Sequence, residues 1–309
     1  MAGEAASFDG SELSLRSGRS TVEVLPAAGG SLTSYSTLIN GRPHDWLRPA
    51  EAAARNSGNA EGMACFPLVP YSNRVRHGRF TFGQRQVQLP VDVVVDPHFE
   101  HGHGWRAQWQ VENCTASTLD LRYEHRPDAW PWAYRARQRI ALTETTLQLT
   151  LSIENGSDEP MPCGMGLHPY FPKTRRTRLL AEVDGLWNTD SEILPTSHTP
   201  CTAASDPATG ILVDQVALDN VFTGWKGIAR ITWPERVAAL TIEADAPLRF
   251  LVVYSPRGEP YFCAEPVSNI TDAFNLASTG HGDTGLLVLE PGQTSIARIR
   301  FTPHLGLSN

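Results

Sequence analysis

The stretch Leu147-Gln148-Leu149-Thr150-Leu151-Ser152-Ile153 decides the fold class of this chain. Its apolar residues alternate with polar ones, and a period of two is typical of a β-strand with one buried face. The pair Asn155-Gly156 follows, and it suits the positive backbone angles of a tight turn. The pattern predicts an antiparallel strand that ends in such a turn.

The same strand pattern recurs along the chain. Residues 119–123 and 297–301 alternate in the same way. Residues 80–89 contain two apolar runs joined through Gly83, which indicates a hairpin. Residues 250–254 are continuously apolar, which is typical of a strand covered on both faces. The single helix-like segment is 49–55, which is short and rich in alanine.

The composition is that of a globular protein. With 309 residues and 41% hydrophobic residues, the chain is neither disordered nor fibrous. Its 25 Gly and 23 Pro make up about 16% of the 309 residues, against a usual share of roughly 12%. This excess favours many turns between many strands. No linker and no internal repeat divides the sequence. We therefore predict one all-β domain over residues 1–309, built from antiparallel strands.

Charge and cysteine content exclude several classes of partner. The net charge of −7 disfavours nucleic acid, because phosphate binding needs a basic surface. The five cysteines are odd in number and lack zinc-ribbon spacing, so neither a disulfide framework nor a structural zinc is expected. No apolar run approaches the roughly 18 residues of a membrane span, and no signal peptide is visible. These features predict a cytoplasmic protein that binds neither nucleic acid nor membrane.

Two residues are candidates for acid–base chemistry. Glu265 follows an apolar run, and a carboxylate there is costly to bury unless it is paired or functional. His168 lies in Gly166-Leu167-His168-Pro169-Tyr170-Phe171-Pro172. A histidine with an ordinary pKa of about 6.5 can exchange a proton near neutral pH, although a satisfied structural role is the common alternative.

Two further residues are candidates for binding. Arg74 lies in the basic segment Asn73-Arg74-Val75-Arg76-His77-Gly78-Arg79-Phe80. Its planar fork of donors suits hydroxyls or a carboxylate, whereas the simpler interpretation is a solvated hairpin entrance. Asp219 lies in Leu218-Asp219-Asn220-Val221-Phe222 and alone would be taken for a turn residue.

The motif His101-Gly102-His103-Gly104-Trp105 raises the question of a metal. Two histidines at positions i and i+2 share one side of a strand, as in cupin metal sites. The next glutamate is Glu112, which is too distant in sequence for that pattern, so no metal is expected. Trp105 suits a sugar-stacking role or a core position, and the sequence favours the core.

Taken in order, these motifs resemble the aldose 1-epimerase (galactose mutarotase) family. The order is Asn-Arg with Gly-Arg-Phe, then His-Gly, Gly-Leu-His-Pro-Tyr-Phe, Leu-Asp-Asn-Val-Phe and Glu-Pro. The similarity extends from about Ala28 to the turn at 289–292 and the final strand. It implies a large antiparallel β-sandwich with an open sugar-binding cleft, which agrees with the strand pattern.

The resemblance also implies roles for individual residues. Glu265 matches the catalytic base and His168 the general acid. His101, Arg74 and Asp219 match residues that hold sugar hydroxyls. No cofactor and no metal is implied. The chain departs from the usual motifs at Glu100, at Pro172 and after Pro266.

The predicted activity is that of an isomerase, an aldose 1-epimerase that interconverts the α and β anomers of a free aldose. A carboxylate and an imidazolium would act from opposite sides of the sugar ring. One alternative is a hexose-phosphate 1-epimerase, for which Arg76 or Arg79 would join Arg74 around the phosphate. Another is a non-catalytic sugar-binding protein. The expected partner is a small sugar, and the expected assembly is a monomer or a homodimer.

Overall fold

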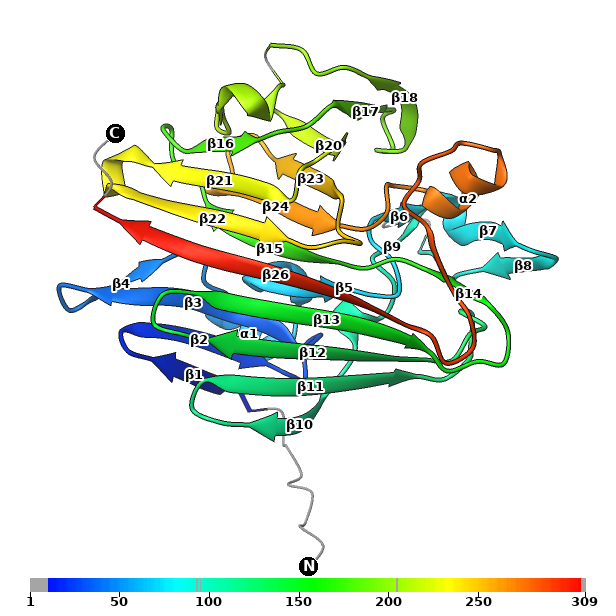
Figure 1. The fold of residues 1–309 in the computed structure, drawn as a ribbon, viewed down its shortest axis with the longest axis horizontal. Coiled ribbons are helices and arrows are strands. Elements are labelled where there is room, and N and C mark those ends of the chain that lie inside the picture. Colours follow the sequence, from blue (N-terminus) through cyan, green and yellow to red (C-terminus); the bar gives the residue numbers. More distant parts are fainter. Residues whose placement is uncertain (1–10, 93, 95, 204, 307–309) are drawn as a thin grey trace, which may run out of the picture.

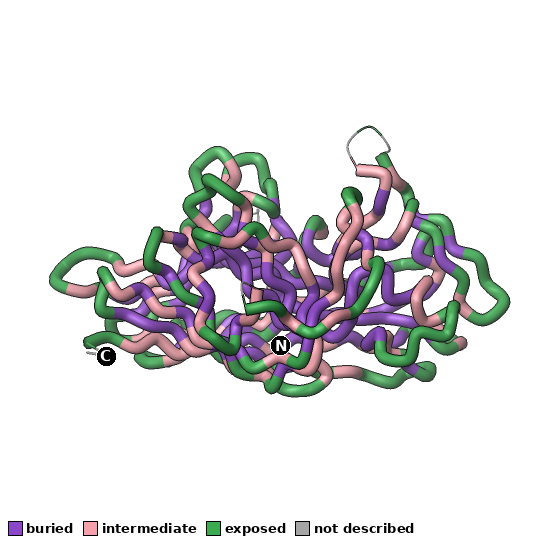
Figure 2. The backbone as a smooth tube through the Cα atoms, turned by 90° about the horizontal axis from the view of Figure 1, so that it is seen from above, coloured by how far each residue is buried: buried purple, intermediate pink, exposed green. Residues whose placement is uncertain are grey.

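The protein consists of two large antiparallel β-sheets packed face to face (Figure 1). The fold is a computed structural model that describes residues 11–92, 94, 96–203 and 205–306. Every strand pair within these residues is antiparallel, and the main hydrophobic core lies between the sheets (Figure 2). The predicted all-β sandwich is confirmed.

The first sheet has eleven strands and carries the candidate site. Its strands, in spatial order, are β1 (Leu13–Ser17), β2 (Ser20–Leu25), β3 (Ser31–Ile39), β5 (Cys65–Leu68), β15 (Gly166–Pro172), β24 (Tyr261–Val267), β23 (Phe250–Ser255), β20 (Leu218–Thr223), β17 (Gly185–Thr189) and β18 (Pro195–Thr199), with β4 (Arg42–Asp45) paired to β3.

The second sheet has nine strands and forms the opposite layer. Its order is β10 (Gln110–Cys114), β11 (Thr118–His125), β12 (Tyr134–Leu142), β13 (Leu147–Asn155), β26 (Thr294–Leu305), β22 (Ala238–Ala244), β21 (Ile228–Trp233), β16 (Arg178–Ala181) and β19 (Ile211–Leu212).

Short elements complete the fold. Three two-stranded pairs are β14 (Met161–Cys163) with β25 (Leu287–Leu289), β6 (Arg74–Val75) with β9 (Phe99–Glu100), and β7 (Arg79–Phe82) with β8 (Arg85–Gln88). The α-helices are α1 (Ala52–Ser57) and α2 (Ala273–Ser278). The predicted hairpin around Gly83 is therefore confirmed as β7 and β8.

Strand β13 shows how the sequence specifies the sandwich. Leu147, Leu149, Leu151 and Ile153 are fully buried, whereas the residues between them are partly exposed. Each fully buried leucine or isoleucine contributes roughly 1.5–3 kcal/mol. A one-residue slip in register would turn this apolar face to solvent, so the pattern fixes the pairing with β12 and β26.

The tight turn predicted at Asn155-Gly156 is wrong, whereas the helix predicted at 49–55 is confirmed with shifted bounds. Neither Asn155 nor Gly156 has a positive φ, and no two-residue hairpin follows β13. Asn155 instead ends the strand and donates its side-chain amide to the carbonyls of Glu159 and Leu289. The helix expected at 49–55 begins at Ala52. Helix α2 was not predicted, because its segment did not stand out as rich in alanine.

Membrane and cysteine expectations can also be compared with the structure. Among the helices in the described part of the chain, none is long and apolar enough to cross a membrane. All five cysteines are free, which agrees with the prediction from their odd number and their spacing that they form no disulfide framework.

Candidate active site

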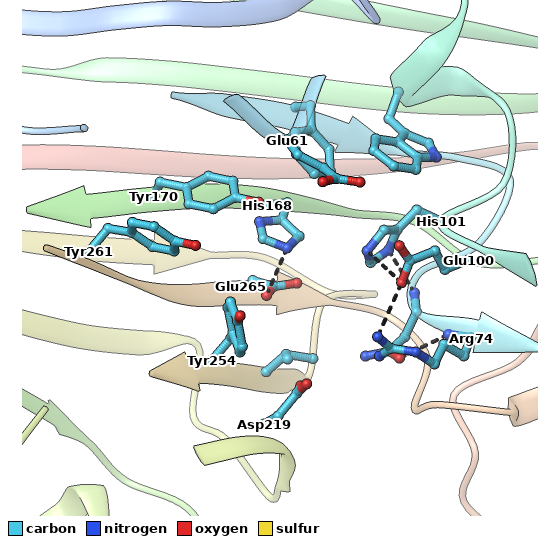
Figure 3. A pocket seen from close by; sticks show the side chains of 14 residues that line it. Glu61, Arg74, Glu100, His101, His168, Tyr170, Asp219, Tyr254, Tyr261 and Glu265 are labelled. Atoms are coloured by element: carbon cyan, nitrogen blue, oxygen red, sulfur yellow. Dashed lines mark hydrogen bonds and ion pairs between the residues drawn. The ribbon is translucent and has the colours of Figure 1, made fainter. Parts of the chain in front are cut away.

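A cavity of about 260 Å³ opens on the outer face of the first sheet, above β15, β24, β23 and β20 (Figure 3). All five residues singled out from the sequence line it, although they come from distant parts of the chain. The lining residues are Glu61, Phe66, Asn73, Arg74, Glu100, His101, Trp105, His168, Tyr170, Asp219, Val252, Tyr254, Tyr261 and Glu265.

Sheet register places His168 beside Glu265. Strands β15 and β24 pair Gly166 with Val267 and Tyr170 with Cys263, so His168 and Glu265 lie opposite each other. Nε2 of His168 is 3.3 Å from Oε1 of Glu265. The two groups are neighbours on adjacent strands.

The imidazole of His168 is held in one orientation by two aromatic rings. Its ring stacks on Phe66 at 4.6 Å and on Tyr170 at 4.7 Å between centroids. The residue is only 7% exposed, and its Nδ1 has no hydrogen-bond partner among the described residues. A rigid, buried imidazole of this kind can direct one nitrogen at a reacting atom.

Burial shifts the pKa values of the pair in opposite directions. It raises the pKa of Glu265 well above the ordinary 4.5, and Asp219 and Glu100 raise it further. Burial lowers the pKa of His168 well below 6.5, and His101 adds to this. Desolvation disfavours the charged form of each group, so burial favours a neutral carboxyl group on Glu265 and a neutral imidazole on His168.

The segment that carries Arg74 is tied to the loop that carries His101. The backbone N–H of Asn73 donates to Nδ1 of His101 at 3.0 Å, and the N–H of His101 donates to the Asn73 carbonyl at 3.0 Å. Because Nδ1 is an acceptor, the proton of the neutral ring sits on Nε2. Burial lowers the pKa of His101 to about 3, so this ring is a neutral donor.

The backbone around these contacts is strained. Asn73 and His101 have φ values of 63° and 61°, a region that non-glycine residues rarely adopt. Gly102 follows with φ of 67°, and a Cβ there would lie 2.6 Å from the Val69 carbonyl oxygen. Strain of this kind clusters at functional sites, where it fixes side-chain directions.

Arg74 is held by carboxylates on two sides. Its Nη2 is 3.6 Å from Oε2 of Glu100, and its Nε is 3.5 Å from Oδ2 of Asp96. Strand pairing explains the first contact, because β6 and β9 place Arg74 directly opposite Glu100. The guanidinium is therefore oriented toward the cavity with its charge already compensated.

Asp219 lies below Glu265 and Tyr254 in Figure 3, with Arg74 to its right. It is paired with Tyr254 across β20 and β23, and both side chains line the cavity. Burial raises the pKa of Asp219 to about 6, while Arg74 opposes the shift. This carboxyl group thus changes charge within the physiological range.

The other two candidates from the motif at 101–105, His103 and Trp105, lie in different surroundings. His103 lies away from His101 and stacks on His125, with the ring centroids 4.6 Å apart. Trp105 is 1% exposed and stacks on Phe66, so it is a core residue that also forms part of the cavity wall.

Two groups of side chains in the described residues bring potential metal ligands within 4.8 Å of one another. They are His103 with His125 and Asp128, and His168 with Cys263 and Glu265. Neither contains His101 with His103, the pair considered from the sequence. Burial raises the pKa of Cys263 well above its usual value, so its sulfur is a thiol rather than the thiolate that metals bind.

Sequence reasoning missed several wall residues. Glu61, Tyr254 and Tyr261 line the cavity, but no motif singled them out. A signal existed for Tyr261, because it lies four residues before Glu265 on one strand and therefore shares its face. Glu61 belongs to the short 3-10 turn Ala60–Gly62, and nothing in the sequence placed that turn at the cavity.

The comparison with known proteins agrees with the fold. A sequence model described as aldose 1-epimerase matches residues 11–302. An Escherichia coli K12 protein named "Uncharacterized protein YphB" is 34% identical over 264 residues, which cover 82% of this chain and 87% of that protein.

Solved structures share the fold over almost the whole chain. A crystal structure of a "Putative aldose 1-epimerase" from Escherichia coli K12 has a TM-score of 0.85 and 30% identity, and it covers 96% of this chain and 99% of that one. A galactose mutarotase-like protein from Clostridium acetobutylicum has a TM-score of 0.85 at 18% identity, with 95% of each chain covered, which concerns the fold alone. Because the family's sequence model spans nearly all of this sequence, the chain belongs to the aldose 1-epimerase family.

Proposed function

We propose that the protein is an aldose 1-epimerase that interconverts the α and β anomers of a neutral free aldose. The observation that carries the proposal is the buried pair His168–Glu265, 3.3 Å apart, on the floor of a cavity walled by hydrogen-bonding side chains. In this proposal residues 1–309 form a single domain, and its binding partner is a small sugar.

The chemistry requires one proton donor and one proton acceptor close together. The base takes the proton of the hydroxyl on C1, and the electron pair of that O–H bond forms the carbonyl. The C1–O5 bond breaks, its electron pair remains on O5, and the acid protonates O5. Because both oxygens are bonded to C1, the two catalytic groups must both reach the atoms around C1, and two neighbouring groups such as His168 and Glu265 meet this requirement.

The proposed reaction needs one proton shared by the pair, so that one group donates while the other accepts. In our proposal Glu265 is the base and His168 the acid during ring opening, so the reacting form carries this proton on His168 and differs from the neutral pair that burial favours. After rotation about the C1–C2 bond the ring closes on the other face, and the two groups reverse their roles.

The other wall residues would bind the sugar. Arg74 and the Nε2–H of His101 are donors to hydroxyl oxygens, and Asp219 is an acceptor from a hydroxyl proton. Tyr254 and Tyr261 offer ring faces and phenol groups to a ring that is apolar on one side. Fixing the sugar in this way supplies a large part of the rate acceleration through orientation.

Polarimetry tests the proposal directly and separates an enzyme from a binding protein. Freshly dissolved α-anomers of several aldoses change optical rotation slowly on their own. We expect the protein to speed this change at catalytic concentrations for at least one neutral aldose. Binding of sugar by calorimetry without any acceleration would instead establish the non-catalytic alternative.

We expect neutral aldoses to be preferred over sugar phosphates. Among the described residues that line the cavity, Arg74 is the one permanent cation, and Glu61, Glu100, Asp219 and Glu265 accompany it. Arg76 does not join it, because the 3-10 turn Arg76–Gly78 ends the extended strand and Nε of Arg76 lies 3.5 Å from Oδ2 of Asp272. A phosphate dianion needs facing cations to offset the nearby carboxylates.

The measurement is kcat/KM on glucose and on glucose 6-phosphate for the wild type and for Arg76→Ala. We expect glucose to be favoured at least about tenfold, since one uncompensated charge interaction exceeds 1.4 kcal/mol at close range. The ratio should be the same in Arg76→Ala. A preference for the phosphate that is lost in Arg76→Ala would support the hexose-phosphate alternative.

A second expectation concerns pH. The pKa of Asp219 is about 6, so the carboxylate that accepts a sugar hydroxyl is present above pH 6 and is lost as the pH falls below it. KM for the neutral aldose should therefore rise between pH 7 and pH 5. In Asp219→Asn, KM should be raised at pH 7 and should vary less over that range. An unchanged pH dependence of KM in Asp219→Asn would remove Asp219 from sugar binding.

A further inference from the structure

Glu100 occupies a special place in the cavity wall. It ends strand β9, which pairs with β6 so that Arg74 is directly opposite, and His101 is the next residue. The three side chains converge in Figure 3, with Glu100 between the other two. Its Oε2 is 3.6 Å from Nη2 of Arg74 and 3.8 Å from Nε2 of His101.

The carboxylate has acceptor capacity left over. No hydrogen bond to its oxygens is present among the described residues, because both of its contacts are longer than hydrogen bonds. The side chain is 23% exposed and is one of those that line the cavity. An ionised carboxylate offers about four lone-pair sites, so Glu100 can accept from a bound molecule without losing either neighbour.

The three groups form a row of donor, acceptor and donor. Arg74 and the Nε2–H of His101 donate, and Glu100 accepts between them. A hydroxyl both donates and accepts, so it can donate to Glu100 while accepting from Arg74 or His101. An anionic substituent cannot donate, and it would lie beside a carboxylate that already offsets Arg74.

From this geometry we infer that Glu100 is a specificity-determining residue, which accepts a hydrogen bond from a sugar hydroxyl and excludes aldoses with an anionic substituent at that position. The inference rests on the proposed epimerase function. Asp96 strengthens the argument, because its Oδ2 lies 3.5 Å from Nε of Arg74 on the other side. Arg74 therefore has no free charge with which to attract an anion.

The test compares glucose with glucuronate, which carries a carboxylate in place of the C6 hydroxyl, and with glucose 6-phosphate. In Glu100→Gln we expect kcat/KM for glucose to fall about tenfold, mainly through KM, because a hydrogen bond to a charged acceptor is lost. The kcat/KM for an anionic sugar should itself rise, so the ratio of kcat/KM for an anionic sugar to that for glucose should rise by more than the loss for glucose alone produces. An unchanged or lower kcat/KM for both anionic sugars would overturn the inference.

Glu100→Asp separates charge from contact. It keeps the negative charge but shortens the side chain, so KM for glucose should rise while kcat/KM for an anionic sugar stays at the wild-type value. A kcat/KM for the anionic sugars that rises equally in Glu100→Asp and Glu100→Gln would show that Glu100 only positions Arg74. Glu243→Gln is the matched control, because Glu243 pairs with Arg300 on the second sheet.

Calorimetry distinguishes failure of this inference from failure of the proposed function. If the wild type binds sugars without accelerating mutarotation, the epimerase proposal fails. The Kd values of glucose and of the anionic sugars, measured in Glu100→Gln and in the wild type, then still decide the role of Glu100. Absence of any sugar binding by the wild type would overturn both.

Discussion

Replacing Glu265 by glutamine is expected to lower kcat for the preferred aldose at least about a hundredfold. Glutamine keeps the shape of the side chain but cannot take the proton of the C1 hydroxyl. General bases contribute about 10²–10⁴-fold, and a hundredfold loss corresponds to about 2.7 kcal/mol of transition-state stabilisation. Initial rates by polarimetry, corrected for spontaneous mutarotation, give this number directly.

The same variant should not lose stability. Because burial raises the pKa of Glu265, its ionisation opposes folding, and this destabilisation is present wherever the pH exceeds the unfolded value near 4.5. A neutral glutamine removes it, so Tm at pH 7 should be unchanged or higher. Glu112→Gln is the control, because Glu112 pairs with Arg122 and Arg137 on the exposed face of the second sheet. Near-normal turnover in Glu265→Gln would exclude Glu265 as the base.

Strand positions were predictable wherever one face is buried. The alternation over 147–153 and the apolar run 250–254 correspond to β13 and β23, because burial requires these patterns. Helix α2 was not predictable in the same way. It is six residues long and begins after Asp272, which has φ of 55° and accepts from the N–H of Arg76. Contacts between distant segments, rather than local propensity, stabilise so short a helix.

The candidate site was predictable as a set of residue types but not as an arrangement. Glu265 and His168 were suggested by chemistry and by family resemblance, yet their adjacency follows from the pairing of β15 with β24. The hexose-phosphate alternative requires Arg76 or Arg79 to lie beside Arg74, and in an extended strand Arg76 would share the side of Arg74. The 3-10 turn at Arg76–Gly78 prevents this, and a three-residue turn leaves no periodic signal in the sequence.

His168→Asn is expected to lower kcat by about 10²–10⁴-fold while sugar binding remains measurable. Asparagine can still hydrogen-bond, but it cannot exchange a proton near neutral pH. The stacking on Phe66 and Tyr170 is lost as well, so some destabilisation is expected from the space left between the two rings. His125→Asn is the matched control, because His125 is also a buried histidine stacked on aromatic rings, but it does not line the cavity.

The pH profile distinguishes a proton carrier from a structural histidine. If the pair works with one proton, the wild-type rate falls on the acid side only when a second proton binds. Burial lowers the pKa of His168, so this acid limb should lie below pH 6.5. This fall of kcat at acid pH should be absent from the pH profile of His168→Asn and present in that of His125→Asn. If His168→Asn abolished sugar binding and left the rate of the bound sugar unchanged, His168 would be a binding group, and the proton donor of the reaction would have to be sought among the other groups that face Glu265.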